Sequence, residues 1–469
     1  MKSLKQTLTW TTVLAVSIVL SACGGGSDSG SSNVGGATRT AETVVFTAND
    51  AILSTGVLAL FAAADDGSSL TRLSSNNVSN VTTIDQFQIS PDKQWVAYIV
   101  NGDAGRANLF VVQILNGTPL QLSEPTASIS SVKEFAWSPN SLQVVYSGDI
   151  SDNGTDEVFL VDRDGSNHQK INGPTNDIVE VVRPQWSPDG RYIVQEVTSQ
   201  GSSTTVALSI FDTRTSGSNS LRLITNTTGQ IRNVSWSPDN SRVGFLADFL
   251  TINDSNIYAI DVDGENLRQV STNSDFLGIF KWSPEGSQIA YLDDVDSNSL
   301  FELHVGAADG SSSNSIVALP GSGGVTNLEW SPNGTDIAYH ANEQSNNIFE
   351  LFAIQSDGSN KRRLSGDMTT SGVANKDGFE WSPNGSQIAY LADQETSTVV
   401  ELFTSNADGS GNQNSTGSPN SLDISQPQWS ADGVRIAFKA GDDSLQVSSV
   451  GGTPVLISDG LTAISQLAY

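Results

Sequence analysis

The chain of 469 residues carries 51 acidic and 23 basic side chains, a formal net charge of −28 at pH 7. A surface this acidic repels phosphate backbones and anionic headgroups, which argues against nucleic-acid binding. The only cysteine, Cys23, excludes a disulfide within the molecule, and three histidines form no Cys/His cluster for zinc. The charge would attract cations or basic partners, or it is simply a solvated surface.

The first 22 residues have the pattern of a secretory signal peptide. Lys2 and Lys5 give a positive start, and the apolar run from Thr11 to Leu20 is too short to span a bilayer as a helix. The sequence Leu-Ser-Ala-Cys follows, ending at Cys23. It resembles the lipobox of bacterial lipoproteins, which implies cleavage before Cys23 and diacylation of its thiol. The alternative is a free thiol beside an ordinary secretory cleavage site.

Residues 23–42 are predicted to form the lipidated cysteine and a flexible tether. The stretch from Gly24 to Gly36 is rich in glycine and serine and cannot bury apolar surface. In the lipoproteins that the motif resembles, an aspartate after the cysteine retains the protein in the inner membrane. Gly24 stands at that position, so the resemblance implies an outer-membrane protein that faces the periplasm or the cell surface.

One phrase, Trp-Ser-Pro-Asp-Gly with variations, recurs eight times in residues 43–469. Its serines fall at positions 90, 138, 187, 237, 283, 331, 382 and 430, and intervals of 46–51 residues are typical of propeller blades. The first copy has Ile89 where the others have tryptophan. We predict that the seven tryptophans pack between neighbouring blades: Trp137, Trp186, Trp236, Trp282, Trp330, Trp381 and Trp429.

The phrase predicts a type I turn that enters a strand of fixed register. Proline presets φ at the second position of the turn, and glycine suits the exit. The strand after it, such as Ile289-Ala290-Tyr291, ends eight positions after the phrase serine in every copy. A third apolar run, an Asp-Gly turn in most copies and a short fourth strand complete an antiparallel unit of four strands.

The two ends of the repeat region are predicted to share one blade. Strands at Val44–Phe46, Val57–Ala62 and Leu70–Leu73 precede the first phrase, and Ile464–Tyr469 follows the last repeat. Pairing them would remove both exposed sheet edges. The sequence therefore predicts an all-β fold: a single closed β-propeller of nine four-stranded blades with a composite terminal blade. Eight blades with loosely docked ends is the alternative.

The phrase and its setting resemble the TolB-type, WD-repeat-like propellers of bacterial envelopes, over roughly Val44 to Tyr469. The TolB protein carries an α/β domain before its propeller, whereas the tether stands in that place here. The resemblance therefore implies the propeller and an envelope location, but not a role in the Tol system.

No catalytic residue, metal site or cofactor is predicted. His168, His304 and His340 lie in three repeats at three different repeat positions, so nothing brings them together. Two turns, Asp162–Asn167 and Asp261–Asn266, offer oxygens at alternating positions, but they lack the final bidentate acid of a calcium loop. Calcium remains an alternative to an ordinary hairpin turn there.

Carboxylates are frequent between the second and third strands of the repeats. These loops share one face of a propeller, where loop variation often carries recognition. The acidic rim is our name for this set, which is either a binding surface or a solvated edge: Asp103, Asp152, Asp156, Asp248, Asp254, Asp293, Asp294, Asp296, Glu343, Asp393, Glu395, Asp442 and Asp443.

The sequence as a whole predicts an envelope lipoprotein, monomeric and not an enzyme, that is attached to the membrane through the lipid on Cys23. Its propeller would be a binding platform for a protein, peptide or glycan ligand. One alternative is a lyase or hydrolase that acts in the propeller channel. Another is a structural or cation-buffering surface protein.

Overall fold

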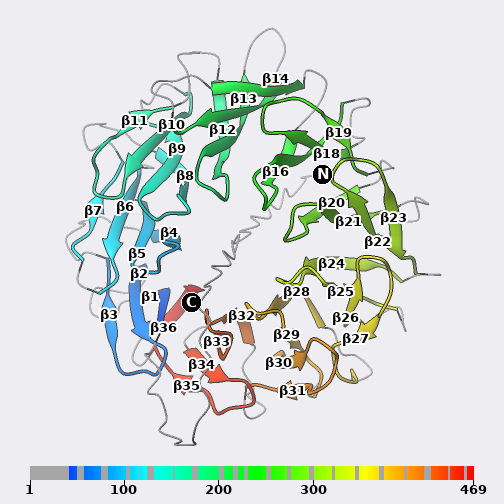
Figure 1. Ribbon diagram of the computed structural model, residues 1–469. Helices are drawn as coiled ribbons and strands as arrows, with labels where there is room; N and C mark the ends of the chain where they lie inside the picture. Colours follow the sequence, from blue (N-terminus) through cyan, green and yellow to red (C-terminus); the bar gives the residue numbers. More distant parts are fainter. Residues whose placement is uncertain are drawn as a thin grey trace, which may run out of the picture. The chain divides into compact units, whose positions relative to one another are not determined.

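A computed structural model describes residues 42–469, of which Figure 1 shows the strands. The predicted signal peptide, Cys23 and the tether up to residue 41 lie outside the described residues. Ala41–Tyr469 forms one compact unit. No helix long and apolar enough to cross a membrane occurs among the described residues. The description omits residues 50–57, 75–82, 102–105, 116, 124–130, 151–153, 172–177, 200–204, 215–219, 227–230, 250–254, 272–275, 295–299, 320–322, 344–347, 369–373, 396–398, 417–423, 442–443 and 459–461.

The part of the chain that the structure describes is all β, with thirty-six strands in eight hydrogen-bonded sheets and no helix. The terminal sheet has the order β3-β2-β1-β36 and consists of β1 (Thr43–Asn49), β2 (Leu58–Ala64), β3 (Leu70–Arg72) and β36 (Thr462–Ala468). Two further groups of four strands are joined at a single residue pair, Ala107 with Ser131, into one eight-stranded sheet. Its strands are β4 (Thr83–Ile89), β5 (Trp95–Asn101), β6 (Ala107–Gln113), β7 (Leu120–Gln121), β8 (Ser131–Trp137), β9 (Gln143–Asp149), β10 (Glu157–Asp162) and β11 (Gln169–Lys170).

Six four-stranded antiparallel sheets follow, each with its strands in chain order. The first three contain β12 (Ile178–Trp186), β13 (Tyr192–Ser199), β14 (Thr205–Asp212), β15 (Ser220–Asn226), β16 (Ile231–Trp236), β17 (Arg242–Ala247), β18 (Asn256–Asp261), β19 (Arg268–Gln269), β20 (Phe276–Trp282), β21 (Gln288–Asp293), β22 (Glu302–Ala307) and β23 (Ser313–Val317). The last three contain β24 (Val325–Trp330), β25 (Asp336–Ala341), β26 (Glu350–Gln355), β27 (Arg362–Arg363), β28 (Ala374–Trp381), β29 (Gln387–Ala392), β30 (Glu401–Asn406), β31 (Gln413–Asn414), β32 (Ile424–Trp429), β33 (Arg435–Ala440), β34 (Ser444–Ser449) and β35 (Val455–Leu456).

The turn predicted from the repeated phrase is confirmed. In the copy at Trp186, the N–H of Gly190 donates to the carbonyl of Ser187 at 2.9 Å. The hydroxyl of Ser187 donates to Asp189 at 2.6 Å and accepts the N–H of Tyr192 at 2.9 Å. Gly190 has a φ of 71°, a left-handed conformation that glycine adopts without steric cost. The serine thus ties the turn to the start of the second strand.

The seven phrase tryptophans lie at the end of the first strand of their sheets, and all are buried. In six of them the indole N–H donates to a backbone carbonyl in the first strand of the preceding group, at 3.0–3.4 Å. The acceptor is always the residue directly before the preceding phrase tryptophan, or before Ile89. Successive sheets are therefore linked along their first strands, which Figure 1 shows on the inner side of the sheets.

Hydrophobic packing joins every group of four strands to the next. One cluster, for example, places Trp282 and Tyr291 of the β20–β23 sheet against Leu246 and Ile257 of the β16–β19 sheet. Nine such clusters occur among the described residues, and each lies between two groups that are consecutive in the chain or between the terminal sheet and its neighbours.

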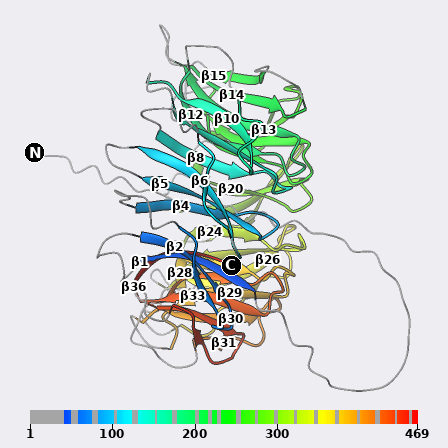
Figure 2. The same ribbon diagram turned by 90° about the vertical axis from the view of Figure 1, so that its left-hand side faces the viewer.

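The terminal sheet packs against both the first and the last repeats. Its β1 pairs with β36 as the sequence predicts, and Figures 1 and 2 both place these strands side by side. One face joins a cluster with β5, and the other joins a cluster with β33 and β34. The fully buried Asp65 pairs with Arg435 of β33 at 2.9 Å and accepts a hydrogen bond from the hydroxyl of Tyr469.

Truncating one phrase tryptophan should destabilise the fold strongly. Trp330→Ala removes an indole packed between two sheets and its 3.1 Å bond to the carbonyl of Lys281. We expect a loss of about 3–5 kcal/mol in the free energy of unfolding, measured by urea denaturation. Leu142→Ala, which alters an exposed side chain, is the control and should change it by less than about 0.5 kcal/mol. A Trp330→Ala protein as stable as this control would contradict the packing role.

Candidate functional site

The described members of the acidic rim lie between a second and a third strand, except Asp293, which is the last residue of the second strand β21. Asp103, Asp152, Asp254, Asp296, Asp442 and Asp443 lie outside the described residues. The members that are described are Asp156, Asp248, Asp293, Asp294, Glu343, Asp393 and Glu395.

These described carboxylates do not form a solvated edge, because most of them are buried. Asp156, Asp248, Asp293, Asp294 and Asp393 are each less than a tenth exposed, Glu343 is half-buried, and only Glu395 is exposed. Of the two interpretations of the rim, a solvated edge does not describe these five aspartates.

Asp156 shows how such pairing works. Its carboxylate contacts the ammonium of Lys133 at 2.8 Å and accepts the backbone N–H of Val181 at 3.1 Å. The acid thus links β8, the loop before β10 and the following β12. Glu343 similarly accepts the hydroxyl of Tyr339 at 2.9 Å and pairs with Lys361. The carboxylates of Asp156 and Glu343 are therefore already paired with groups of the same chain.

A second polar pattern connects the start of the third strand to the fourth strand. The two residues are thirteen positions apart in every instance. Glu350 pairs with Arg363 at 2.8 Å, and Glu401 accepts the side-chain amide of Asn414 at 2.9 Å. The other instances are Asn108 with Gln121, Glu157 with Lys170, and Asn256 with Gln269.

The β20–β23 sheet departs from this pattern. Thirteen positions after Glu302 stands Ser315, and the carboxylate of Glu302 lies 3.4 Å from Nε2 of His304 instead. Beside them in the register, Asp293 is fully buried and neither of its carboxylate oxygens has a hydrogen-bond partner. Burial raises the pKa of Asp293, and the charges of Asp294 and Glu302 raise it further, while His304 lowers it.

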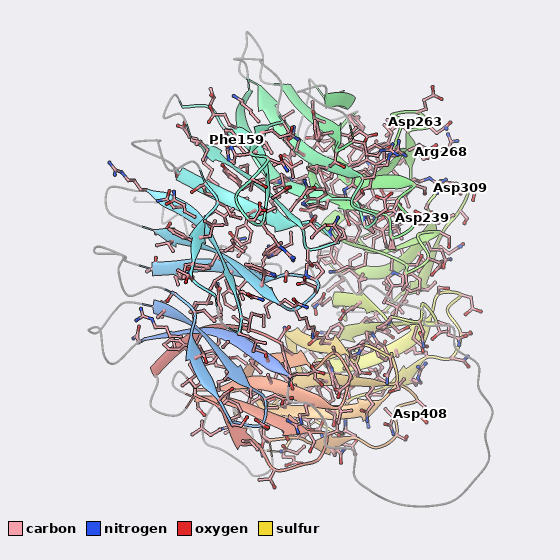
Figure 3. The ribbon with its side chains drawn as sticks, turned by 60° about the vertical axis from the view of Figure 1, so that its left-hand side comes forward. Phe159, Asp239, Asp263, Arg268, Asp309 and Asp408 are labelled. Carbon is pink, nitrogen blue, oxygen red and sulfur yellow. The ribbon has the colours of Figure 1, made fainter. Side chains whose placement is uncertain are left out.

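The Asp-Gly turns are satisfied by hydrogen bonds of their own. In the turn that begins at Asp162, Asp164 accepts the N–H and the hydroxyl of Ser166 at 2.9 and 2.6 Å. These bonds hold the pKa of Asp164 below its usual value. Figure 3 shows Asp263, Asp309 and Asp408 on equivalent turns. No group of three or more His, Cys, Asp or Glu side chains that could hold a metal ion occurs in the described part of the chain.

The three histidines lie in three different sheets. His168 meets the hydroxyl of Tyr146 at 2.5 Å and stacks on Phe159. His304 stacks on Tyr291, and the fully buried His340 packs edge-on against Phe379. His168 and His304 therefore take part in the aromatic packing of their own sheets, whereas His340 of β25 packs against the following sheet.

The position directly before the phrase tryptophan was missed by our sequence reasoning. The side chain at this position points to the opposite face of the first strand from the tryptophan (or Ile89) that follows it. This side chain is half-buried or exposed in all eight repeats. The chemistry at this position varies while the frame around it stays the same. Aligning the repeats on their tryptophans would have revealed it: Gln88, Ala136, Gln185, Ser235, Lys281, Glu329, Glu380 and Gln428.

Two neighbouring members of this set are acids in a poorly solvated place. Desolvation raises the pKa of Glu329 to about 7, although Lys281 on the preceding first strand lowers it. Desolvation also raises the pKa of Glu380 to about 8, with a further increase from the charge of Glu329. One carboxylate oxygen of Glu380 is buried without a hydrogen-bond partner. Near pH 7 to 8 this pair is therefore only partly ionised, and a nearby positive charge would favour the ionised form of both acids.

With this repeat geometry established, the comparison with known families is informative. Residues 175–370 match the family model described as the TolB beta propeller domain. This segment is therefore similar to a TolB beta propeller domain. The matched segment includes four of the phrase copies, from Trp186 to Trp330, and the resemblance inferred from that phrase is confirmed.

Solved structures show similarity to the propeller at the level of fold. A eukaryotic initiation factor has a TM-score of 0.61 at 11% identity, over 91% of this chain and 98% of the other. Dipeptidyl peptidase 4 of Porphyromonas gingivalis has a TM-score of 0.58 at 14% identity, over 82% of this chain and 62% of the other. No curated protein sequence matches the chain. At these identities the likeness concerns the fold alone.

Two buried acids of the rim should respond in opposite ways to neutralisation. Asp156→Asn loses an ion pair, so we expect the propeller to be about 1–3 kcal/mol less stable at pH 7. Asp293→Asn removes a carboxyl whose pKa is raised by folding, so stability at pH 7 should be equal or higher.

The pH dependence gives the sign of the Asp293 effect. The pKa of Asp293 is raised in the folded protein. Its contribution to the stability of the fold is therefore fully present below its ordinary pKa of 3.8, and it is lost as the pH rises through its pKa in the folded protein. Asp293→Asn should abolish that loss, which thermal unfolding from pH 3 to 8 measures. The same slope in the variant and the wild type would contradict the buried, unpaired state of Asp293.

Proposed function

We propose that the protein is a lipoprotein of the bacterial cell envelope whose propeller binds a protein or peptide partner. Cys23 would carry the lipid, residues 24–42 would serve as the tether, and residues 43–469 would form the propeller. Gly24 after the lipidated cysteine supports an outer-membrane location, facing the periplasm or the cell surface. The envelope setting of TolB-type propellers supports the same assignment.

We further propose that the propeller is a closed ring of nine blades, with the terminal sheet as the composite blade. The pairing of β36 with β1 supports closure, as does the cluster on each face of this sheet. The contacts of Asp65 with Arg435 and Tyr469 join the two ends of the chain. A closed ring leaves no free sheet edge, so the domain can be a rigid platform.

One observation carries the binding function: the repeats keep their frame and vary at the position before the tryptophan. The serine turn, the buried tryptophan and the second strand recur with nearly the same contacts. The preceding position changes among amide, hydroxyl, ammonium, carboxylate and methyl groups. These side chains face the first strand of the following group, as the amides of Gln88 and Gln185 do. In a closed ring they would lie along its inner edge, beside the channel, so the frame holds a set of different polar groups around one space. This arrangement suits recognition by a rigid scaffold.

Site-specific photocrosslinking in cells tests this function. A benzophenone amino acid at Gln185 or Gln428 would lie along the proposed channel, and the same residue at Arg268 would lie on an exposed fourth strand. We expect a discrete crosslinked species from the two inner positions and none from Arg268. Equal crosslinking from all three positions, or none from either inner position, would contradict binding in the channel.

A further inference from the structure

The β24 and β28 strands differ from the other first strands in one hydrogen bond. By the repeated pattern, the indole N–H of Trp381 should donate to the carbonyl of Glu329. Trp381 is only 4% exposed, yet its N–H has no hydrogen-bond partner. A buried donor without a hydrogen bond is costly, which favours an acceptor supplied from outside the fold.

The unpaired indole lies in the same gap as a carboxyl group. Successive side chains of a strand point to opposite faces, and Trp330 of β24 packs towards the β20–β23 sheet. The preceding Glu329 therefore faces the β28–β31 sheet. Trp381 packs against β25 and β26 of the β24–β27 sheet from the other side of this gap. The Trp381 indole and the Glu329 side chain thus lie between the same two sheets.

Glu380 adds a second carboxyl on the adjacent strand. It directly precedes Trp381, it interacts electrostatically with Glu329, and one of its oxygens is buried and unpaired. The charged side chains acting on the pair are Lys281 from β20, which affects Glu329, and the two acids themselves; β32 contributes the backbone N–H of Trp429. Lys281 supplies the positive charge among these groups, and it acts on Glu329. If both carboxyls ionise, one negative charge is left without a positive partner among these groups.

We propose that this cluster, Glu329, Glu380 and the Trp381 indole, binds a basic side chain of a partner peptide. The guanidinium or ammonium group would pair with the two carboxylates, and a carbonyl oxygen of the peptide would accept the indole N–H. An arginine suits this best, because its planar fork can contact both carboxylates. The proposal rests on the proposed function and specifies one subsite of the channel.

A cation in this subsite would favour the ionised form of both acids. Because the pKa of Glu329 is about 7 and that of Glu380 about 8, the acids are partly protonated near pH 7.5. Binding should therefore release protons at pH 7.5, and the release should vanish above about pH 9, where both acids are already ionised. A neutral ligand would produce no such release.

Titration calorimetry with the peptide Ac-Gly-Arg-Gly-amide tests the proposal. Its counterpart with citrulline in place of arginine has the same shape without the charge. We expect the arginine peptide to bind and to release protons, as measured in two buffers of different ionisation enthalpy, and the citrulline peptide to bind at least tenfold more weakly. Equal affinities for the two peptides, or no binding of the arginine peptide, would overturn the proposal.

Matched variants separate the subsite from the general acidity of the protein. Glu380→Gln should weaken arginine-peptide binding at least tenfold, whereas Glu285→Gln, which removes an exposed acid on a phrase turn, should leave it unchanged. Equal losses would indicate unspecific attraction and overturn the subsite. A neutral oligosaccharide, cellotetraose, that binds wild type but not Glu380→Gln would overturn it in favour of a glycan.

Trp381→Phe tests the indole independently of folding. It should lower peptide affinity and cost less stability than Trp330→Phe, because Trp330 loses a formed hydrogen bond and Trp381 loses none. Equal stability losses together with unchanged affinity would overturn the role of the indole. If the peptide does not bind while crosslinks at Gln185 persist, the subsite fails and the platform function stands.

Discussion

The contact of each phrase tryptophan with the preceding first strand is the constraint on which the rest of this structure depends. A β-sheet of four short strands cannot bury both faces alone, so each sheet needs a neighbour on each side. The indole fills the space between neighbouring sheets. In six of the seven it also fixes their relative position, because its N–H donates to one particular carbonyl, as that of Trp429 does to the carbonyl of Glu380. The serine turn that follows then sets the register of the second strand. One short phrase thus specifies both the sheet and its neighbour.

The terminal sheet obeys the same constraint without a tryptophan. The strand in the corresponding place, β36, is followed by the smaller Tyr469, and part of the cohesion comes from the fully buried Asp65. A buried carboxylate is tolerated only when it is well paired, and Arg435 and Tyr469 provide the pairing from the other end of the chain. The acid makes contacts that are available only when the two ends of the chain meet.

The fold could be predicted from the sequence because its signals are local and repeated. The serine spacing gives the period of the repeat, the Ser-Pro-Asp-Gly residues give the turn, and a segment such as Ile289-Ala290-Tyr291 gives the strand. A single copy of this phrase would be ambiguous, but eight copies are not. The candidate site could not be predicted in the same way. Whether Asp293 is solvated or buried depends on what packs around the end of β21, and whether the N–H of Trp381 is bonded depends on small shifts between two sheets. The residue types of the repeat predict neither the burial of Asp293 nor the hydrogen bonding of the Trp381 indole.

Closure of the ring is the central claim, and a disulfide across the terminal strands tests it most directly. Thr47 and Gln466 are paired residues of β1 and β36. In a Cys23→Ser background, which removes the only native cysteine, Thr47→Cys and Gln466→Cys should oxidise to a disulfide in the folded protein and raise the thermal unfolding midpoint. Two thiols that remain reduced and react freely with a thiol reagent in the folded state would contradict closure through β36.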